Sequence, residues 1–180
     1  ENGTADMTQQ LTQLPCIESI GKEKFAGKLL DDSIKYCDCV ITDVTGFEKM
    51  IRPAFTNVVG TYPEKENEIM LSTKTLQYLG IKNPEVGMEI ELDFYWNDIF
   101  NTSGTGMQNF LLSGYFTEYQ NQTSGASVAF ISEKSMEKNG LQWERCRILI
   151  DHTKKYSSGS QIEHMLTNNI KLNEGQRIVS

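Results

Sequence analysis

The stretch Gly60-Thr61-Tyr62-Pro63-Glu64-Lys65-Glu66-Asn67-Glu68-Ile69-Met70-Leu71-Ser72 decides the fold of this chain. Pro63 marks a turn, and the short apolar run of residues 68–71 predicts a strand. Ser72 is a favourable N-cap for a helix of one to two turns. Gly80 suits the position just after that helix, because glycine adopts the left-handed backbone conformation without strain. The stretch therefore predicts a turn, a strand, a short helix and a second turn.

A strand with one buried face follows this unit. Apolar side chains alternate with polar ones or glycine along residues 86–94, which is the period of a strand with one face in a core and one in water. The polar, glycine-containing residues 97–106 then lead into a second apolar stretch, residues 107–116. We expect a hairpin with a long loop.

Strands and helices alternate on both sides of this β-rich block. Strands are expected at residues 34–44, 128–131 and 145–151, the first of them central in its sheet. Ser132 predicts the start of a helix that ends at Asn139 and Gly140. Three further helices are expected behind capping pairs, namely Asp6 with Gln9, Thr45 with Glu48, and Ser160 with Glu163.

This order of elements indicates an α+β fold. Each α/β flank is too short to bury a core alone, so we expect one split α/β unit of residues 1–60 and 126–180. A β-rich subdomain, residues 61–125, is expected as an insertion into that unit. No internal repeat is apparent in the sequence.

Composition narrows the class of partner. The chain has 180 residues, 17 basic against 24 acidic side chains, and a net charge of −7, which opposes binding to nucleic acids. No stretch reaches the roughly 20 apolar residues of a membrane span, and no signal peptide opens the chain. The start at Glu1 and the strand-like end at Arg177 to Ser180 lead us to expect a piece of a longer protein.

A family resemblance rests on motifs already quoted. The turn at residues 60–63, the segment 67–72, then Leu79-Gly80 and Val86-Gly87 before the alternating strand resemble the extracytoplasmic core domain of MacB/FtsX-type ABC transporter permeases. The resemblance covers about residues 34–170. It implies a porter-like split α/β unit with an inserted β-rich subdomain, which matches the division expected above.

The resemblance also implies a function. Such a domain performs no chemistry and holds no cofactor. It couples ATP hydrolysis in the cytoplasm to export, extraction or sensing of a substrate outside the bacterial cell membrane. The implied partners are a cognate ABC ATPase, a second permease copy, and a peptide or lipoprotein substrate, including antimicrobial peptides in resistance permeases. The alternative is a stand-alone secreted or surface-attached module that binds a peptide or glycan.

Enzyme and metal sites find little support in the sequence. Neither a phosphate-binding loop nor a nucleophile elbow is present, and His152 and His164 are the only histidines. Cys146 with His152 can be written as a nucleophile pair, but Cys146 falls on the expected buried face of a strand, where a thiol is inert. No metal ligand set is expected, because Cys37 and Cys39 lack a second ligand pair.

The cysteines leave the disulfide state open. The chain has four of them: Cys16, Cys37, Cys39 and Cys146. Cys37 and Cys39 stand two apart in an expected strand, which is an awkward geometry for bonding each other. A bridge from either one to Cys16 or Cys146 stays feasible, as do four buried thiols.

Aromatic residues mark the candidate contact surface. Tyr95, Trp96, Phe100 and Tyr119 bracket the long loop of the β-rich block, where exposed rings could meet a peptide, a lipid headgroup or a protein. The alternative is a local apolar cluster beneath the loop.

Overall fold

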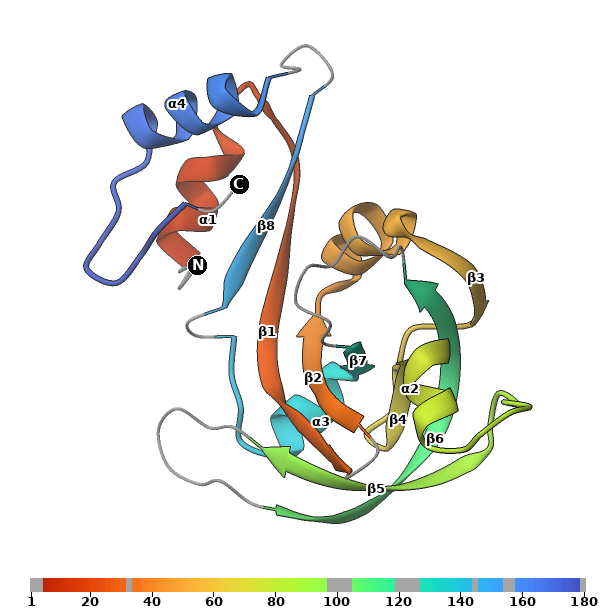
Figure 1. Cartoon of the computed structure of the whole chain (residues 1–180). Helices are drawn as coiled ribbons and strands as arrows, with labels where there is room; N and C mark the ends of the chain where they lie inside the picture. The colour runs from red at the N-terminus through yellow and green to blue at the C-terminus, as the bar shows by residue number, and fades with distance from the viewer. Residues whose placement is uncertain are drawn as a thin grey trace. The chain divides into compact units, whose positions relative to one another are not determined.

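Figure 1 shows the computed structural model, which describes residues 5–31, 34–96, 105–118, 127–143, 146–153 and 158–178. Helices and a mixed sheet occur together, so the predicted α+β class is confirmed. In chain order the elements are α1 (Ala5–Thr12), β1 (Ile17–Asp31), β2 (Ile34–Thr42), the π-helical turn η1 (Gly46–Ile51), the 3-10 turn η2 (Arg52–Ala54), β3 (Phe55–Gly60), β4 (Glu68–Ser72), α2 (Thr73–Tyr78), β5 (Glu89–Trp96), β6 (Thr105–Glu118), β7 (Ser127–Ile131), α3 (Glu133–Lys138), β8 (Arg147–His152) and α4 (Gly159–Asn169).

The chain folds into two compact units, and both are discontinuous in sequence. Unit 1 comprises residues 1–24, 42–52 and 143–180, and unit 2 comprises residues 25–41 and 53–142. These boundaries differ from the expected ones. Residues 25–41, 53–60 and 126–142 belong to unit 2, where the sequence analysis had assigned them to the split α/β part. The reason is strand pairing, because β2 and β7 are hydrogen-bonded neighbours within unit 2.

Unit 2 is built around a closed ring of strands (Figure 1). Strands β2, β7, β4, β6, β5 and β1 follow one another, and β1 pairs back onto β2 to close the ring. The β2–β7 and β4–β6 pairs are parallel, whereas β4–β7, β5–β6 and β1–β5 are antiparallel. Strand β2 is therefore paired on both sides, which confirms that it is central. Strand β3 pairs with the end of β6.

The faces of β5 follow the predicted alternation. Its inward side chains Ile90, Leu92, Phe94 and Trp96 are buried, whereas Glu89 and Glu91 are exposed. Aromatic rings fill much of the ring's core. Phe116 stacks on Phe55 with centroids 4.0 Å apart and lies 5.7 Å from Phe130. Val86 departs from the prediction: it is 52% exposed and precedes the strand.

A strand and a capped helix occur twice in unit 2. In β4–α2 the hydroxyl of Ser72 accepts the backbone N–H of Thr75 at 3.1 Å, as predicted for the helix start. In β7–α3 the hydroxyl of Ser132 accepts the N–H of Ser135, also at 3.1 Å. Gly80 and Gly140 follow the two helices with φ of +75° and +72°, which confirms both predicted helix ends.

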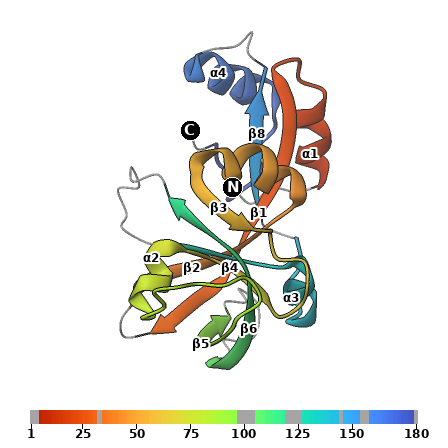
Figure 2. The same cartoon turned by 90° about the vertical axis from the view of Figure 1, so that its right-hand side faces the viewer.

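The two copies are related by a local two-fold axis. Met70 and Phe130 occupy equivalent places in the copies, and they lie opposite each other where β4 and β7 pair antiparallel. Helices α2 and α3 accordingly lie on opposite sides of the ring in Figure 2. Beyond the serine caps and the glycines, few side chains are shared. The sequence therefore shows no repeat although the structure has one.

Unit 1 packs helices against a pair of strands. The first part of β1 pairs antiparallel with β8, from Ile17 opposite His152 to Glu23 opposite Arg147. Met7 and Leu11 of α1, Leu166 of α4 and Ile170 form a small core. Partly buried side chains surround it, among them Ile17, Ile20, Ile148, Ile150, Ile162 and Ile178.

The three predicted capping pairs are wrong, although each predicts a helical segment. Asp6 lies inside α1 and Ser160 lies inside α4, whose N-cap position is taken by Ser158. Thr45 has helical backbone angles and makes no side-chain cap bond. Asp43 replaces it, because its Oδ1 accepts the N–H of Gly46 at 2.7 Å.

Candidate functional site

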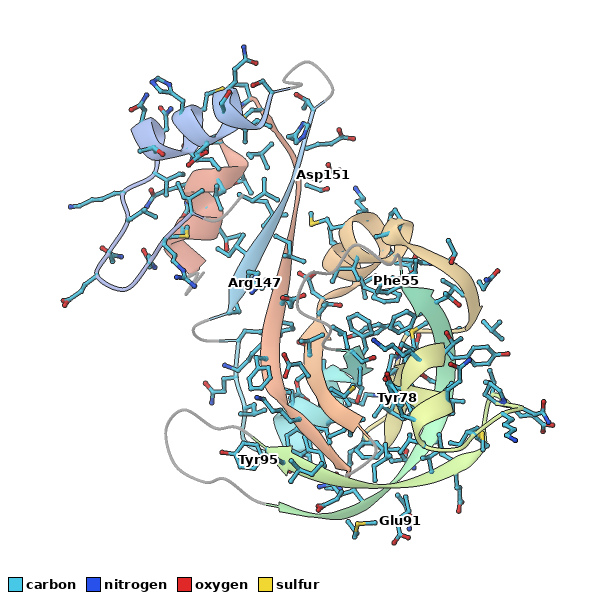
Figure 3. The ribbon with its side chains drawn as sticks, viewed as in Figure 1. Phe55, Tyr78, Glu91, Tyr95, Arg147 and Asp151 are labelled. Carbon is cyan, nitrogen blue, oxygen red and sulfur yellow. The ribbon has the colours of Figure 1, made fainter. Side chains whose placement is uncertain are left out.

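The predicted aromatic surface is only partly within the described residues. Trp96 is 7% exposed and its ring lies 4.4 Å from that of Phe94, so it belongs to the core of unit 2. Its inward orientation follows from the alternation along β5. Tyr95 is half-buried on the opposite, outer face (Figure 3), between Lys28 and Thr105 of the neighbouring strands. Phe100 and Tyr119 lie outside the described residues.

Cys146 and His152, the groups considered for catalysis, differ in their surroundings. Cys146 is 3% exposed, and burial raises the pKa of its thiol. The imidazole Nδ1 of His152 lies 3.3 Å from the carbonyl oxygen of Thr153 and is exposed. Within the ranges that the structure describes, no group of three or more His, Cys, Asp and Glu side chains could hold a metal ion.

All four cysteines are buried, and none of them forms a disulfide. Burial, together with the nearby Cys37 and Asp38, raises the pKa of Cys39 well above its ordinary value. Cys37 packs near the hydroxyl of Thr75, at a sulfur-to-oxygen distance of 3.8 Å. The cysteines therefore serve as apolar packing.

An apolar hollow of about 380 Å³ lies within unit 1. We call it the β8 groove. Its lining is mostly aliphatic, with a few charged or polar side chains among them. It is lined by Met7, Leu11, Arg147, Ile148, Leu149, Ile150, His152, Gly159, Ile162, Glu163, Leu166, Ile170, Leu172, Arg177 and Ile178. Its size is in the range of small-ligand sites, and its apolar lining with few polar groups is typical of them.

The groove runs along strand β8. Arg147, Ile148, Leu149 and Ile150 all line this groove. Ile148 and Ile150 also pack against the cluster that contains Met7, Leu11 and Leu166, so the groove runs along β8 between the strand and the helices α1 and α4.

One ion pair stands at the start of β8. Arg147 Nη1 lies 2.8 Å from Oε1 of Glu23 on β1. Burial raises the pKa of Glu23, and the guanidinium of Arg147 only partly opposes this shift. The side chain of Arg147 remains 53% exposed, so it also faces solvent at the end of the groove.

The sequence predicted the residues of the groove as core rather than as surface. The apolar stripe of α4 and the alternation of Ile148 and Ile150 gave that prediction. In the structure both isoleucines are only half-buried. Leu149 is the feature of the sequence that could have indicated the groove. It makes residues 148–150 apolar on both faces, which is unusual for a strand with one wet face.

Comparison with known proteins finds similar folds among solved structures. No protein-family model matches the sequence. No curated protein matches it either. Among solved structures, the periplasmic region of MacB from Actinobacillus actinomycetemcomitans is similar, with a TM-score of 0.56 and 10% identity. That match covers 93% of this chain and 72% of the other.

A second solved structure is the extracellular domain of the noncanonic ABC-type transporter YknZ from Gram-positive bacteria. Its TM-score is 0.52 at 9% identity, over 90% of this chain and 77% of that one. Both matches extend over nearly the whole chain, so they include units 1 and 2. The chain therefore has the fold of the extracytoplasmic domains of MacB-type ABC transporters.

Proposed function

We propose that this chain is the extracytoplasmic domain of an FtsX/MacB-like ABC transporter permease. It performs no catalysis itself. It couples ATP hydrolysis in the cytoplasm to export, extraction or sensing of a substrate outside the bacterial cell membrane. The observation that carries the proposal is the fold match across 93% of the chain to the periplasmic region of MacB.

The proposed partners are a cognate ABC ATPase, reached through membrane-spanning parts of the same protein, and a second permease copy. A peptide, a lipoprotein or another extracytoplasmic molecule is the substrate. No helix in the described part of the chain is long and apolar enough to cross a membrane. Tyr95, with Phe100 and Tyr119, is the proposed substrate-contact surface.

The first test is the reading frame around the chain. We expect an apolar span of roughly 20 residues just before Glu1 and about three spans after Ser180. Polar sequence on both sides would overturn the proposal.

The second test measures coupling. The complete permease and its ATPase are reconstituted in lipid, and residues 1–180 are replaced by a short Gly/Ser linker. We expect basal ATP hydrolysis to persist and its response to substrate to disappear. The matched control is Glu91→Gln on the exposed face of β5, which should leave both unchanged. A full substrate response without the domain would contradict the coupling role.

A stand-alone peptide- or glycan-binding module is the second candidate. The observation in its favour is the β8 groove, whose mostly aliphatic lining with a few charged or polar side chains suits a small ligand. The two candidates separate on the flanking sequence, because a secreted module needs no spans around it.

A further inference from the structure

Strand β8 ends the sheet in unit 1. It pairs with β1 and with no other strand among the described residues. Its central residues Ile148, Leu149 and Ile150 are half-buried, and the groove runs beside them. The second edge of β8 pairs with no described strand, and an apolar edge of this kind is a template for pairing with another strand.

The contacts of β1 fix which backbone groups of β8 face the open edge. The N–H of Lys22 donates to Oδ1 of Asp43 at 3.1 Å, and the carbonyl of Lys22 accepts the N–H of Asp43 at 3.1 Å. Both groups of Lys22 therefore point away from β8. Lys22 lies opposite Ile148, so this is a non-hydrogen-bonded pair of the antiparallel ladder.

It follows that the N–H and C=O of Ile148 point to the open edge. Hydrogen-bonding direction alternates along a strand, and Ile150 lies opposite Ile20 in unbroken register. The backbone groups of Ile150 therefore point outward as well, while those of Leu149 point to β1. The edge offers two donors and two acceptors, spaced as an antiparallel partner requires.

The charges of β8 are complementary to a copy of β8. The segment reads Arg147-Ile148-Leu149-Ile150-Asp151, with a cation at one end and an anion at the other. Figure 3 shows Arg147 and Asp151 near the two ends of the strand. An antiparallel pair centred on Leu149 would set Arg147 of each copy opposite Asp151 of the other. The same register sets Ile148 opposite Ile150, which aligns their outward donors and acceptors.

We propose that β8 pairs antiparallel with β8 of a second copy of this chain, with the two-fold axis at Leu149. The inference deepens the proposed function, in which a second permease copy is a partner. Two short strands bury less area than a stable complex needs, so the pairing is weak between free copies. Anchoring both copies in one membrane raises their effective concentration and strengthens it.

A disulfide at the axis tests the register directly. Leu149 would lie opposite Leu149 of the second copy in a non-hydrogen-bonded pair, in which the two Cα atoms are about 4.5 Å apart. That spacing suits a disulfide. We expect Leu149→Cys in the full chain to form a covalent dimer under mild oxidation, because the native thiols are buried. Met107→Cys is the control, being 59% exposed on β6 in unit 2.

The expected result is at least tenfold faster dimer formation by Leu149→Cys than by Met107→Cys at equal concentration. Equal rates would overturn the proposal. The proposal would also be overturned if the Leu149→Cys chain stays monomeric because another segment or an added peptide occupies the edge of β8.

The charge pattern gives an independent test in the Leu149→Cys background. Asp151→Arg alone and Arg147→Asp alone place like charges opposite each other, so each should cross-link several-fold more slowly. Mixing the two variants restores opposite charges across the pair and should yield the mixed dimer, identified by a size tag. No rescue in the mixture would overturn the register.

Arg147→Asp also removes the ion pair with Glu23, so its fold is checked by circular dichroism. If it does not fold, Asp151→Asn provides the graded comparison. It should slow cross-linking less than Asp151→Arg. Loss of the β8 pairing leaves the coupling assay of the proposed function unaffected, so the two ideas fail separately.

Discussion

Gly21 of β1 and Gly46 of η1 lie backbone against backbone in unit 1. A Cβ atom on Gly21 would stand 2.3 Å from the Cα atom of Gly46 and 2.6 Å from its backbone nitrogen. Neither neighbour is a movable side chain. The approach allows Asp43 Oδ1 to accept the N–H groups of both Lys22 and Gly46, at 3.1 Å and 2.7 Å.

Gly21→Ala should therefore lower the free energy of unfolding by about 1–3 kcal/mol, because the added methyl group forces the backbone of η1 away from β1. Chemical denaturation measures the change. The matched control is Gly106→Ala, also within a strand, where an added Cβ meets nothing within 4 Å. Equal effects of the two substitutions would contradict the close approach.

The two equivalent helix caps should differ in their contribution to stability. Ser132→Ala removes the cap of α3 and should cost about 1 kcal/mol. Both cap hydroxyls lie 3.0 Å from the hydroxyl three residues on, Thr75 Oγ1 or Ser135 Oγ, but Ser72 Oγ also lies 2.6 Å from the buried Ser127 Oγ, so Ser72→Ala should cost more, about 2 kcal/mol.

The double variant Ser72→Ala with Ser127→Ala checks the source of that difference. If the hydroxyls interact, its cost is smaller than the sum of the two single costs. Additive costs, or equal costs for Ser72→Ala and Ser132→Ala, would rule out the contact with Ser127 as the cause.

Glu68 should make stability depend on pH. Partial burial opposes its ionisation, but the backbone N–H groups of Lys65 and Glu64 and the ammonium of Lys65 outweigh this, and its pKa is lowered from 4.5. Both N–H groups lie 2.9 Å from Oε2. A lowered pKa in the folded state means that the stabilisation is present above pH 4.5 and is lost as pH falls through the lowered value.

Glu68→Gln should thus lower the free energy of unfolding by about 1–2 kcal/mol at pH 7. The difference from the unaltered chain should shrink steadily below pH 4.5. Denaturation curves from pH 7 to pH 3 test this, with the exposed Glu91→Gln as the control expected to show no difference. Parallel pH profiles for Glu68→Gln and the unaltered chain would refute it.

The four cysteines should be unreactive until the chain unfolds. Each is buried and outside any disulfide, and burial raises the pKa of Cys39 and of Cys146, which disfavours the reactive thiolate. A colourimetric thiol reagent at pH 8 should label none in the native protein and all four after unfolding without reductant. Two labelled thiols after unfolding would instead show a disulfide.

The sequence predicted the elements better than their arrangement. Ser72, Gly80, Ser132 and Gly140 identify both short helices correctly, because caps and left-handed glycines depend on a few neighbouring residues. The unit boundaries depend on which distant strands pair. Nothing in residues 34–42 by themselves shows that they pair with Ser127–Ile131.

The capping pairs and Trp96 show the same limit at the level of single residues. Thr45 loses the capping role to Asp43, whose side chain is positioned by its contact with Lys22 on β1. Trp96 was named as part of a possible contact surface, with a local apolar cluster beneath the loop as the alternative, and the alternation along β5 turns it inward. The β8 groove was not predictable, since it depends on how α1, α4 and β8 leave a gap between them.

Closure of the ring in unit 2 has a consequence for the order of folding. The helices α2 and α3 and the β5–β6 pair join residues near in sequence and can form early. The pairing of β2 with β7 joins Cys37 to Ser127 and Val40 to Phe130, so it must bring together segments that are further apart in sequence than those joined by β1 and β5. Such non-local contacts are slow to form because loop-closure entropy is lost before they stabilise anything. The seam between β2 and β7 should be the last part of the ring to form and should set its folding rate.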